Sequence, residues 1–352
     1  MVEVQDECVT FTAPPGAACL IGDFSDWDER PIPISTPVTL EFPQGAYVEY
    51  AFLDTEGTML ADPMNTCTPR NGWYEEHRYV ALPGCSYTTP LRSQELNGTV
   101  RRHERYSNAL GEHRTYHVYE PATRPSATMY VHDGDAFLRK LRLHEVVDSL
   151  TKQECIHPIR VVFIVPQDRE REYWFNERYE RFVLDELIPA VESQYGVSPE
   201  RALWGASLGG MVSAWLALRN PHIFARVASQ SGCFTAHPQG TNYYRDPEWL
   251  TTQFTDSPPQ PLRFYVETGQ IEWLLAPNRR FAAMLVDKGY PHRYREWPGG
   301  HNWTTWEQGL EPGLKYLFAL PPTRRNQGGA WPHVTPDTIR GAVPPVPATW
   351  LI

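Results

Sequence analysis

Short runs of apolar and β-branched residues, separated by turn-forming residues, dominate the first 85 positions of the chain. Clusters such as Pro14-Pro15-Gly16 and Asp54-Thr55-Glu56-Gly57 interrupt these runs and favour turns. The runs predict strands at residues 9–12, 18–21, 38–42 and 48–53. Strands at this spacing indicate a small all-β sandwich domain.

From about residue 111 the pattern changes to strands that alternate with helical stretches. The β-branched run at 159–165 is typical of a strand buried on both faces, and residues 181–192 have helical periodicity. Further strands are expected at 115–119, 128–132, 202–205, 262–267 and 294–297, and further helices at 211–218 and 279–288. This alternation predicts a mostly parallel sheet with helices on both faces.

These patterns predict the domain organisation of the 352-residue chain. Residues 1–105 are expected to hold the β-domain and a linker, because the stretch from 86 to 110 is polar. Residues 106–320 are expected to form the α/β domain. The segment 321–352, rich in Pro, Gly, Thr and Arg, predicts an extended C-terminal tail.

The formal net charge of −10 argues against nucleic acid or an anionic membrane as the main partner. No run of 18 apolar residues predicts a membrane span, and the acidic N-terminus lacks the pattern of a secretory signal, so a cytoplasmic location is expected. The cysteines show no C-x-x-C pair, so we expect buried free thiols and no zinc site; disulfides among the first four would require export. The cysteines are Cys8, Cys19, Cys67, Cys85, Cys155 and Cys233.

A candidate nucleophile stands in Gly205-Ala206-Ser207-Leu208-Gly209. The motif lies between a predicted strand and a predicted helix, an arrangement that raises a serine hydroxyl above the edge of a sheet. The two glycines allow a tight turn and a close approach of helix to strand. This context predicts an α/β-hydrolase fold with Ser207 as nucleophile, whereas a structural glycine-rich turn is the alternative.

In that fold the chain order is serine, acid, histidine. His301 follows two glycines after the last predicted strand, where a flexible loop can bring the imidazole to the sheet edge. His292 and His222 are weaker candidates, because one lies near a helix on the surface and the other in a turn after Asn220-Pro221. His301 is therefore the expected general base.

The acid is expected at or just after the strand that ends near residue 266. Glu272, on the following loop, is our preferred candidate, because its carboxylate could fix the imidazole tautomer. Glu267 at the strand end is the alternative, as is a serine–histidine pair that works without an acid.

One oxyanion donor is expected from the backbone N–H of Leu208, at the start of a helix. The second is expected from His132-Asp133-Gly134-Asp135, after the strand at 128–132. We assign it to Asp135, with Gly134 as the alternative. A metal site in this acidic loop is a competing interpretation. Gly134, Arg169 and Trp303 are candidate substrate-binding residues.

The N-terminal region resembles the early-set immunoglobulin-like modules that precede glycogen-branching and related enzymes. The resemblance rests on Gly22-Asp23-Phe24-Ser25-Asp26-Trp27, on residues 46–52 and on Ala61-Asp62-Pro63. It leaves two interpretations open: a packing domain with Trp27 in its core or at an interface, or a glucan-binding module.

The α/β region resembles the enterochelin (enterobactin) esterases, within the esterase-D/antigen-85-like group, over roughly residues 115–315. The landmarks are Tyr130-Val131-His132-Asp133-Gly134, Asp168-Arg169, Arg171-Glu172, Glu186-Leu187-Ile188-Pro189, residues 205–210, Gln230-Ser231-Gly232, Glu267-Thr268-Gly269 with Glu272, and Gly299-Gly300-His301 followed by Trp306, Gly309 and Leu310. The resemblance implies hydrolysis of a catecholate siderophore ester. Such a strongly anionic substrate calls for a basic site, for which Arg169, Arg171, Arg178 and Arg181 are candidates; a solvated helix face is the alternative explanation of these four arginines.

Taken together, the sequence predicts a serine ester hydrolase that acts on a small-molecule ester through an acyl-enzyme and needs no cofactor. Feruloyl or other carboxylic esters, or acyl transfer to an alcohol, are alternatives within the same fold. An alternative of another class is a non-catalytic carbohydrate-binding or scaffold protein.

Overall fold

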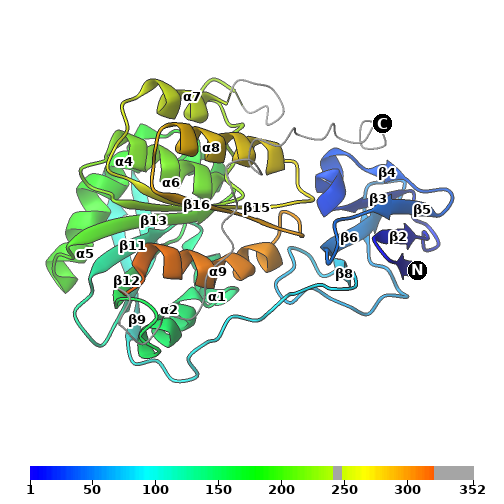
Figure 1. The fold of residues 1–352 in the computed structure, drawn as a ribbon, viewed down its shortest axis with the longest axis horizontal. Helices are drawn as coiled ribbons and strands as arrows, with labels where there is room; N and C mark the ends of the chain where they lie inside the picture. Colours follow the sequence, from blue (N-terminus) through cyan, green and yellow to red (C-terminus); the bar gives the residue numbers. More distant parts are fainter. Residues whose placement is uncertain (241–247, 321–352) are drawn as a thin grey trace.

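The computed structural model describes residues 1–240 and 248–320, which form two lobes (Figure 1). The smaller N-terminal lobe is all β, and the larger lobe is a sheet covered by helices. An extended segment, light blue to cyan in Figure 1, leads from one lobe to the other. The expected fold class, an α/β domain preceded by a small all-β domain, is confirmed.

The N-terminal lobe is a sandwich of two antiparallel sheets that share one apolar core. One sheet has the order β1 (Val2–Gln5), β2 (Cys8–Phe11), β5 (Val38–Glu41). The other has the order β4 (Ile32–Pro33), β3 (Cys19–Gly22), β6 (Tyr47–Leu53), β7 (Met59–Leu60), with β8 (Arg78–Ala81) paired to β6. Two short 3-10 helices, η1 (Asp23–Ser25) and η2 (Trp27–Glu29), follow β3.

Within the described residues, the larger lobe has one eight-stranded sheet, parallel except at the β9–β10 edge, where β9 and β10 pair antiparallel with each other and β10 with β12. In spatial order its strands are β16 (His292–Trp297), β15 (Arg263–Gly269), β14 (Arg226–Gln230), β13 (Glu200–Ala206), β11 (Ala127–Val131), β12 (Ile159–Ile164), β10 (Glu112–Glu120) and β9 (Thr99–Ser107). The central strands are buried on both faces, as their apolar runs predict.

Helices cover both faces of this sheet (Figure 1). One face carries α1 (Gly134–Arg139), α2 (Leu143–Lys152) and α9 (Trp303–Phe318). The other carries α3 (Arg169–Tyr173), α4 (Glu177–Arg181), η3 (Phe182–Leu187), α5 (Ile188–Tyr195), α6 (Leu208–Arg219), α7 (Trp249–Asp256) and α8 (Leu275–Asp287).

Two segments differ from the sequence prediction. Residues 99–107, expected within a polar linker, form β9, and the expected division at residue 105 falls inside this strand. β9 is an edge strand whose outward side chains are charged, so its apolar signal is weak. The helix expected over 181–192 contains the π-helical turn η3, in which each hydrogen bond spans five residues and not four.

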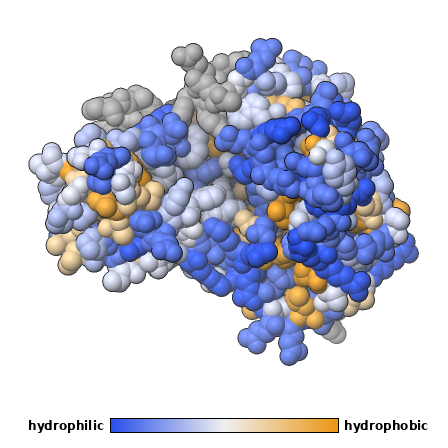
Figure 2. Space-filling view, turned by 180° about the vertical axis from the view of Figure 1, so that it is seen from behind, coloured by the Kyte–Doolittle hydropathy of each residue, from blue (hydrophilic) through white to orange (hydrophobic). Residues whose placement is uncertain are grey.

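The surface of both lobes, seen from behind, is mostly hydrophilic with small apolar groups (Figure 2). Among the described residues, no helix is long and apolar enough to cross a membrane. The six cysteines are free thiols. The expectation of burial holds for Cys233 alone, because Cys67 is exposed and the other four are half-buried. The predicted C-terminal tail, 321–352, lies outside the described residues.

Buried carboxyl groups lie where the two lobes meet. Glu49 on β6 is 1% exposed and lies 3.6 Å from the His77 imidazole, and its side chain accepts a hydrogen bond from Thr304 of the larger lobe. Burial raises the pKa of Glu49 to about 8 and lowers the pKa of His77 to about 4. At neutral pH both groups are therefore neutral, and their contact is not an ion pair.

The pKa of Glu49 makes the stability of this junction depend on pH. Because the folded pKa lies above the ordinary value, the contribution is fully present below about pH 4.5 and is lost as the pH rises through about 8. We expect Glu49→Gln to reduce the fall in the unfolding midpoint between pH 6 and pH 9, measured by thermal denaturation. An identical pH dependence in wild type and variant would contradict this account.

Candidate active site

Ser207 lies in a sharp turn between β13 and α6. Its backbone has φ 57° and ψ −124°, a strained conformation for a residue with a side chain. The Ser207 N–H donates to Gln230 O at 2.9 Å, and the Cys233 N–H donates to Ser207 O at 3.1 Å. The turn is therefore held from the neighbouring strand β14 and the loop that follows it.

The glycines around Ser207 are required by packing. A Cβ on Gly205 would lie 2.3 Å from the carbonyl carbon of Gly209, so the turn closes only without a side chain at 205. A Cβ on Gly209 would lie 3.0 Å from a carboxylate oxygen of Asp133. The motif thus brings the first turn of α6 against both β13 and the loop after β11.

His301 and Glu272 are in direct contact. His301 Nδ1 lies 2.5 Å from Glu272 Oε2, and both side chains are buried. Since an ionised carboxylate can only accept, Nδ1 carries the hydrogen and Nε2 has a free lone pair. The His301 ring packs between Trp273, at 4.4 Å, and Trp306, at 5.0 Å.

Hydrogen bonds keep the Glu272 carboxylate ionised in this buried place. Its Oε1 accepts from Thr268 Oγ1 at 2.5 Å and from the Gly269 N–H at 2.7 Å. Burial alone would raise the pKa of Glu272, but the His301 charge and the hydrogen bonds from His301, Thr268 and Ser231 outweigh it and hold that pKa below its usual value.

Glu267, the other candidate acid, faces a different set of partners. Its carboxylate accepts from Tyr265 Oη at 2.6 Å and from Gln230 Nε2 at 2.9 Å, and it lies 3.6 Å from Arg295. Burial raises its pKa. Of the two acids, only Glu272 contacts the imidazole.

Ser231 connects the serine turn to the histidine. Ser231 follows Gln230, whose carbonyl holds the Ser207 N–H, and its Oγ accepts from Trp306 Nε1 at 3.0 Å. Trp306 packs edge-on against His301, and the Ser231 hydroxyl also donates to Glu272. Ser207, Glu272 and His301 therefore follow the carboxyl ends of β13, β15 and β16, and Ser231 follows the end of β14 between them.

The loop after β11 supplies backbone N–H groups on the other side of Ser207. The Asp133 N–H donates to Tyr173 Oη at 2.8 Å, so it is already used. Gly134 and Asp135 open α1, where N–H groups have no carbonyl partner within the helix. A Cβ on Gly134 would lie 2.3 Å from the Phe163 carbonyl carbon, which shows that Gly134 is needed for packing α1 on β12.

The candidate substrate residues Arg169 and Trp303 have other partners. The Arg169 guanidinium binds both carboxylate oxygens of Asp133, at 2.7 and 2.9 Å, and donates to Ala206 O at 3.2 Å. Arg169 therefore holds the backbone of Ala206, the residue before Ser207, and the Asp133 carboxylate neutralises its charge. Trp303 is 5% exposed and packs against Trp306 and Phe137, so the structure places it in the core.

The metal interpretation of the His132–Asp135 loop is not supported. His132 is buried, its Nδ1 lies 3.0 Å from Ser213 Oγ, and burial lowers its pKa to about 3. Asp133 pairs with Arg169, and Asp135 pairs with Arg139. Within residues 1–240 and 248–320, no group of three or more His, Cys, Asp or Glu side chains could hold a metal ion.

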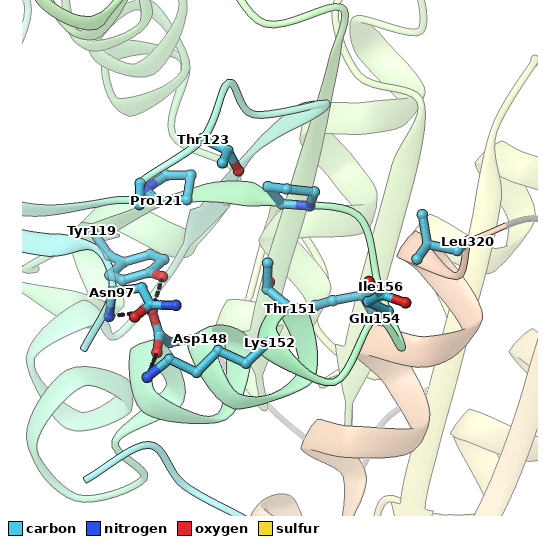
Figure 3. Close-up of a pocket in the computed structure, with 12 residues that line it drawn as sticks. Asn97, Tyr119, Pro121, Thr123, Asp148, Thr151, Lys152, Glu154, Ile156 and Leu320 are labelled. Carbon is cyan, nitrogen blue, oxygen red and sulfur yellow. Dashed lines mark hydrogen bonds and ion pairs between the residues drawn. The ribbon is translucent and has the colours of Figure 1, made fainter. Parts of the chain in front are cut away.

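A cavity of about 310 Å³ lies away from Ser207, near the amino ends of β11 and β12 (Figure 3). Its polar groups are already paired, since Asp148 accepts from Tyr119 Oη at 2.8 Å and binds Lys152 at 2.9 Å. Ligands of open α/β sheets bind at the carboxyl ends of the strands. We therefore assign the cavity no part in the site around Ser207.

Two features of the site escaped the sequence analysis. Trp273 directly follows Glu272, is half-buried and packs on the His301 ring, but an isolated tryptophan in the sequence does not predict such a contact. Asp23 of the N-terminal lobe binds Asn302, a contact across 279 positions of sequence. No local pattern predicts a pair so far apart.

Comparison with known proteins identifies the class. The family described as "Putative esterase" matches residues 107–317. The iron(III) enterobactin esterase of Dickeya dadantii is 26% identical over 290 residues, 74% of this chain and 65% of that protein. The crystal structure of the enterobactin esterase of Shigella flexneri has a TM-score of 0.69 at 20% identity and aligns over 90% of this chain and 95% of that one. The ferulic acid esterase of Anaeromyces mucronatus has a TM-score of 0.53 at 15% identity, over 65% and 93%.

Because the family match covers more than half of the chain, the protein belongs to this esterase family. The α/β-hydrolase fold and the resemblance to enterochelin esterases are confirmed. Family membership supports carboxylesterase activity.

The contact between Glu272 and His301 predicts a difference between the two buried acids. We expect Glu272→Gln to lower kcat roughly a thousand- to ten-thousandfold, because the imidazole loses the carboxylate that orients and stabilises it. The same substitution at Glu267 removes a buried carboxylate at the end of the same strand. It should lower the melting temperature and leave kcat within a few-fold. Equal kcat losses in the two variants would contradict the assignment.

Proposed function

We propose that the protein is a serine carboxylesterase that works through an acyl-enzyme. The observation that carries the proposal is a serine in a strained turn after β13, at the same edge of the sheet as a histidine whose Nδ1 lies 2.5 Å from a buried carboxylate. Since Glu272 holds Nδ1, the other ring nitrogen of His301 is left to accept the proton of Ser207.

In the proposed reaction, Ser207 Oγ attacks the ester carbonyl carbon while its proton passes to His301 Nε2. Glu272 stabilises the resulting imidazolium. The tetrahedral oxyanion accepts hydrogen bonds from the N–H groups of Leu208 and Asp135, and each such donor contributes about 3 kcal/mol in comparable hydrolases. The intermediate then expels the alcohol, which takes the proton from His301.

Water completes the cycle by the reverse sequence. His301 takes a proton from water as the hydroxide attacks the acyl carbon. The bond between the acyl carbon and Ser207 Oγ then breaks, the carboxylic acid leaves, and Ser207 Oγ takes the proton back from His301. An alcohol that replaces water in this step would make the enzyme an acyltransferase. The products formed with and without added alcohol distinguish these outcomes.

For the substrate, we propose the ester bonds of a catecholate siderophore. The support is the two-domain layout: the Shigella enterobactin esterase aligns over 90% of this chain, N-terminal lobe included, whereas the fungal ferulic acid esterase aligns over 65%. The test is hydrolysis of a panel that contains p-nitrophenyl acetate, a feruloyl ester and a catecholate trilactone with and without iron. The proposal expects the highest kcat/KM for the trilactone and none in Ser207→Ala. Preference for the feruloyl ester would overturn the substrate; full activity of Ser207→Ala would overturn the mechanism.

Near the candidate site, the Asp26 carboxylate disfavours the anionic ferric complex relative to the iron-free trilactone. Of the four arginines considered for a basic site, Arg169 is neutralised by Asp133, and Arg171 is exposed. Arg178 donates to backbone carbonyls of residues 109 and 110, and Arg181 donates to that of Glu177. Asp26 lies close enough to Glu272 and Cys233 for its charge to act on both.

This charge distribution gives a pH-dependent prediction. Burial raises the pKa of Asp26 to about 7, so its carboxylate repels an anionic substrate at pH 8 and is neutral at pH 5.5. We expect Asp26→Asn to raise kcat/KM for the ferric complex several-fold at pH 8 and to change it little at pH 5.5, measured by steady-state kinetics. The neutral p-nitrophenyl ester is the control. An unchanged ratio of ferric to iron-free activity at pH 8 would contradict the role of Asp26.

A further inference from the structure

The loops that carry Glu272 and His301 are both attached to the N-terminal lobe. Ile271, directly before Glu272, is 3% exposed, and its side chain belongs to the apolar core of the β-sandwich. Its N–H donates to Gly299 O at 3.1 Å, which joins the two loops. The Tyr47 N–H of β6 donates to Pro298 O at 2.8 Å. The backbone segments that carry Glu272 and His301 therefore pack against the β-sandwich.

Asp23 is the residue of the N-terminal lobe that contacts the histidine loop most closely. It opens η1, is 1% exposed, and its Oδ2 accepts from Asn302 Nδ2 at 2.8 Å and from the Glu49 N–H at 2.8 Å. A Cβ on Gly300 would lie 2.1 Å from Asp23 Cγ. The loop is thus seated on the Asp23 carboxyl group, which leaves room only for glycine at 300.

Asn302 links this contact to the rest of the larger lobe. It is the N-cap of α9, its Oδ1 accepts from the Thr305 N–H at 2.9 Å, and it is fully buried. Its amide therefore binds the helix with one atom and Asp23 with the other. Gly300 and Asn302 both contact Asp23, and His301 between them contacts Glu272. The residues on both sides of His301 are therefore held by the same aspartate.

We propose that Asp23 is a positioning residue for catalysis: through Asn302 and Gly300 it sets the place of the His301 imidazole, so that the β-sandwich forms part of the catalytic centre. The inference rests on the proposed serine esterase function. It adds a role in positioning the base to the two sequence interpretations of the N-terminal lobe, as a packing domain or a glucan-binding module.

The position of the His301 imidazole affects the reaction rate. A displacement of about 1 Å in a catalytic group can cost about a hundredfold in rate, even when substrate binding is unchanged. Both donors, the Asn302 amide and the Glu49 N–H, bind Asp23 Oδ2, and Oδ1 is buried without a hydrogen-bond partner among the described residues. In Asp23→Asn the amide nitrogen therefore either takes the place of Oδ1 without an acceptor or, in the opposite orientation, faces both donors. Asn302→Asp places two carboxyl groups against each other. Each change releases one end of the segment that carries His301.

The two side chains can be exchanged. In the double variant Asp23→Asn/Asn302→Asp, the amide oxygen at 23 accepts from the Glu49 N–H and the amide nitrogen donates to the carboxylate at 302. That carboxylate still caps α9 by accepting from the Thr305 N–H. The exchange restores a donor–acceptor pair between positions 23 and 302 with the same number of heavy atoms, so it should bring His301 back toward its wild-type position.

Asp62 offers a matched control in the same lobe. It is fully buried, and its carboxylate accepts from Tyr50 Oη at 2.9 Å and from the Met64 N–H at 2.9 Å, both within the β-sandwich. Asp62→Asn therefore weakens the lobe without touching residues 298–302. It separates loss of stability from loss of positioning.

The experiment measures kcat, KM and the melting temperature of the full chain for these four variants, with p-nitrophenyl acetate as substrate. We expect Asp23→Asn and Asn302→Asp each to lower kcat ten- to a hundredfold with little change in KM. The double variant should recover most of the loss, and Asp62→Asn should lower the melting temperature but not kcat. The proposal would be overturned if either single variant kept the wild-type kcat, or if the double variant were no more active than the single variants. An equal loss of kcat in Asp62→Asn would also overturn it. Wild-type activity that survives in Ser207→Ala would instead overturn the proposed function, independently of the exchange.

Discussion

The contact between Glu272 and His301 is the interaction on which the account of this protein depends. It joins the loop after β15 to the loop after β16, and it gives the imidazole one defined tautomer. The surrounding structure keeps this buried carboxylate charged, because Thr268, Gly269 and Ser231 add hydrogen bonds to it. A buried carboxylate without these donors would take up a proton and could no longer stabilise the imidazolium.

The N-terminal lobe is part of the same constraint. Ile271 lies in the core of the β-sandwich, one residue before the acid, and Asp23 binds the residue that follows the base. The loops that carry the acid and the base are therefore fixed by packing from the N-terminal lobe as well as by the strands from which they emerge. This explains why a small β-domain without catalytic groups of its own lies against the carboxyl edge of the sheet (Figure 1).

The features that the sequence predicts well are those encoded locally. The apolar runs of the central strands, the glycine-flanked Ser207 turn and the Gly-Gly-His loop depend on neighbouring residues, and the structure has them where they were expected. Features set by distant contacts were missed. β9 is a charged edge strand with little apolar signal. The sequence favoured Glu272 over Glu267 only as a preference, because which of the two side chains faces His301 depends on tertiary contacts. The Asp23–Asn302 contact joins two lobes and leaves no trace in either local pattern.

The most direct test of the central claim is labelling with a fluorophosphonate, which reacts only with a serine whose proton can be withdrawn. The account predicts one stoichiometric adduct on the peptide that contains Ser207, detected by mass spectrometry. The adduct should be absent in Ser207→Ala and should form much more slowly in His301→Ala and Glu272→Gln. Failure of the folded wild-type protein to react, or a label on another residue, would contradict the assignment of Ser207, His301 and Glu272 as one catalytic unit.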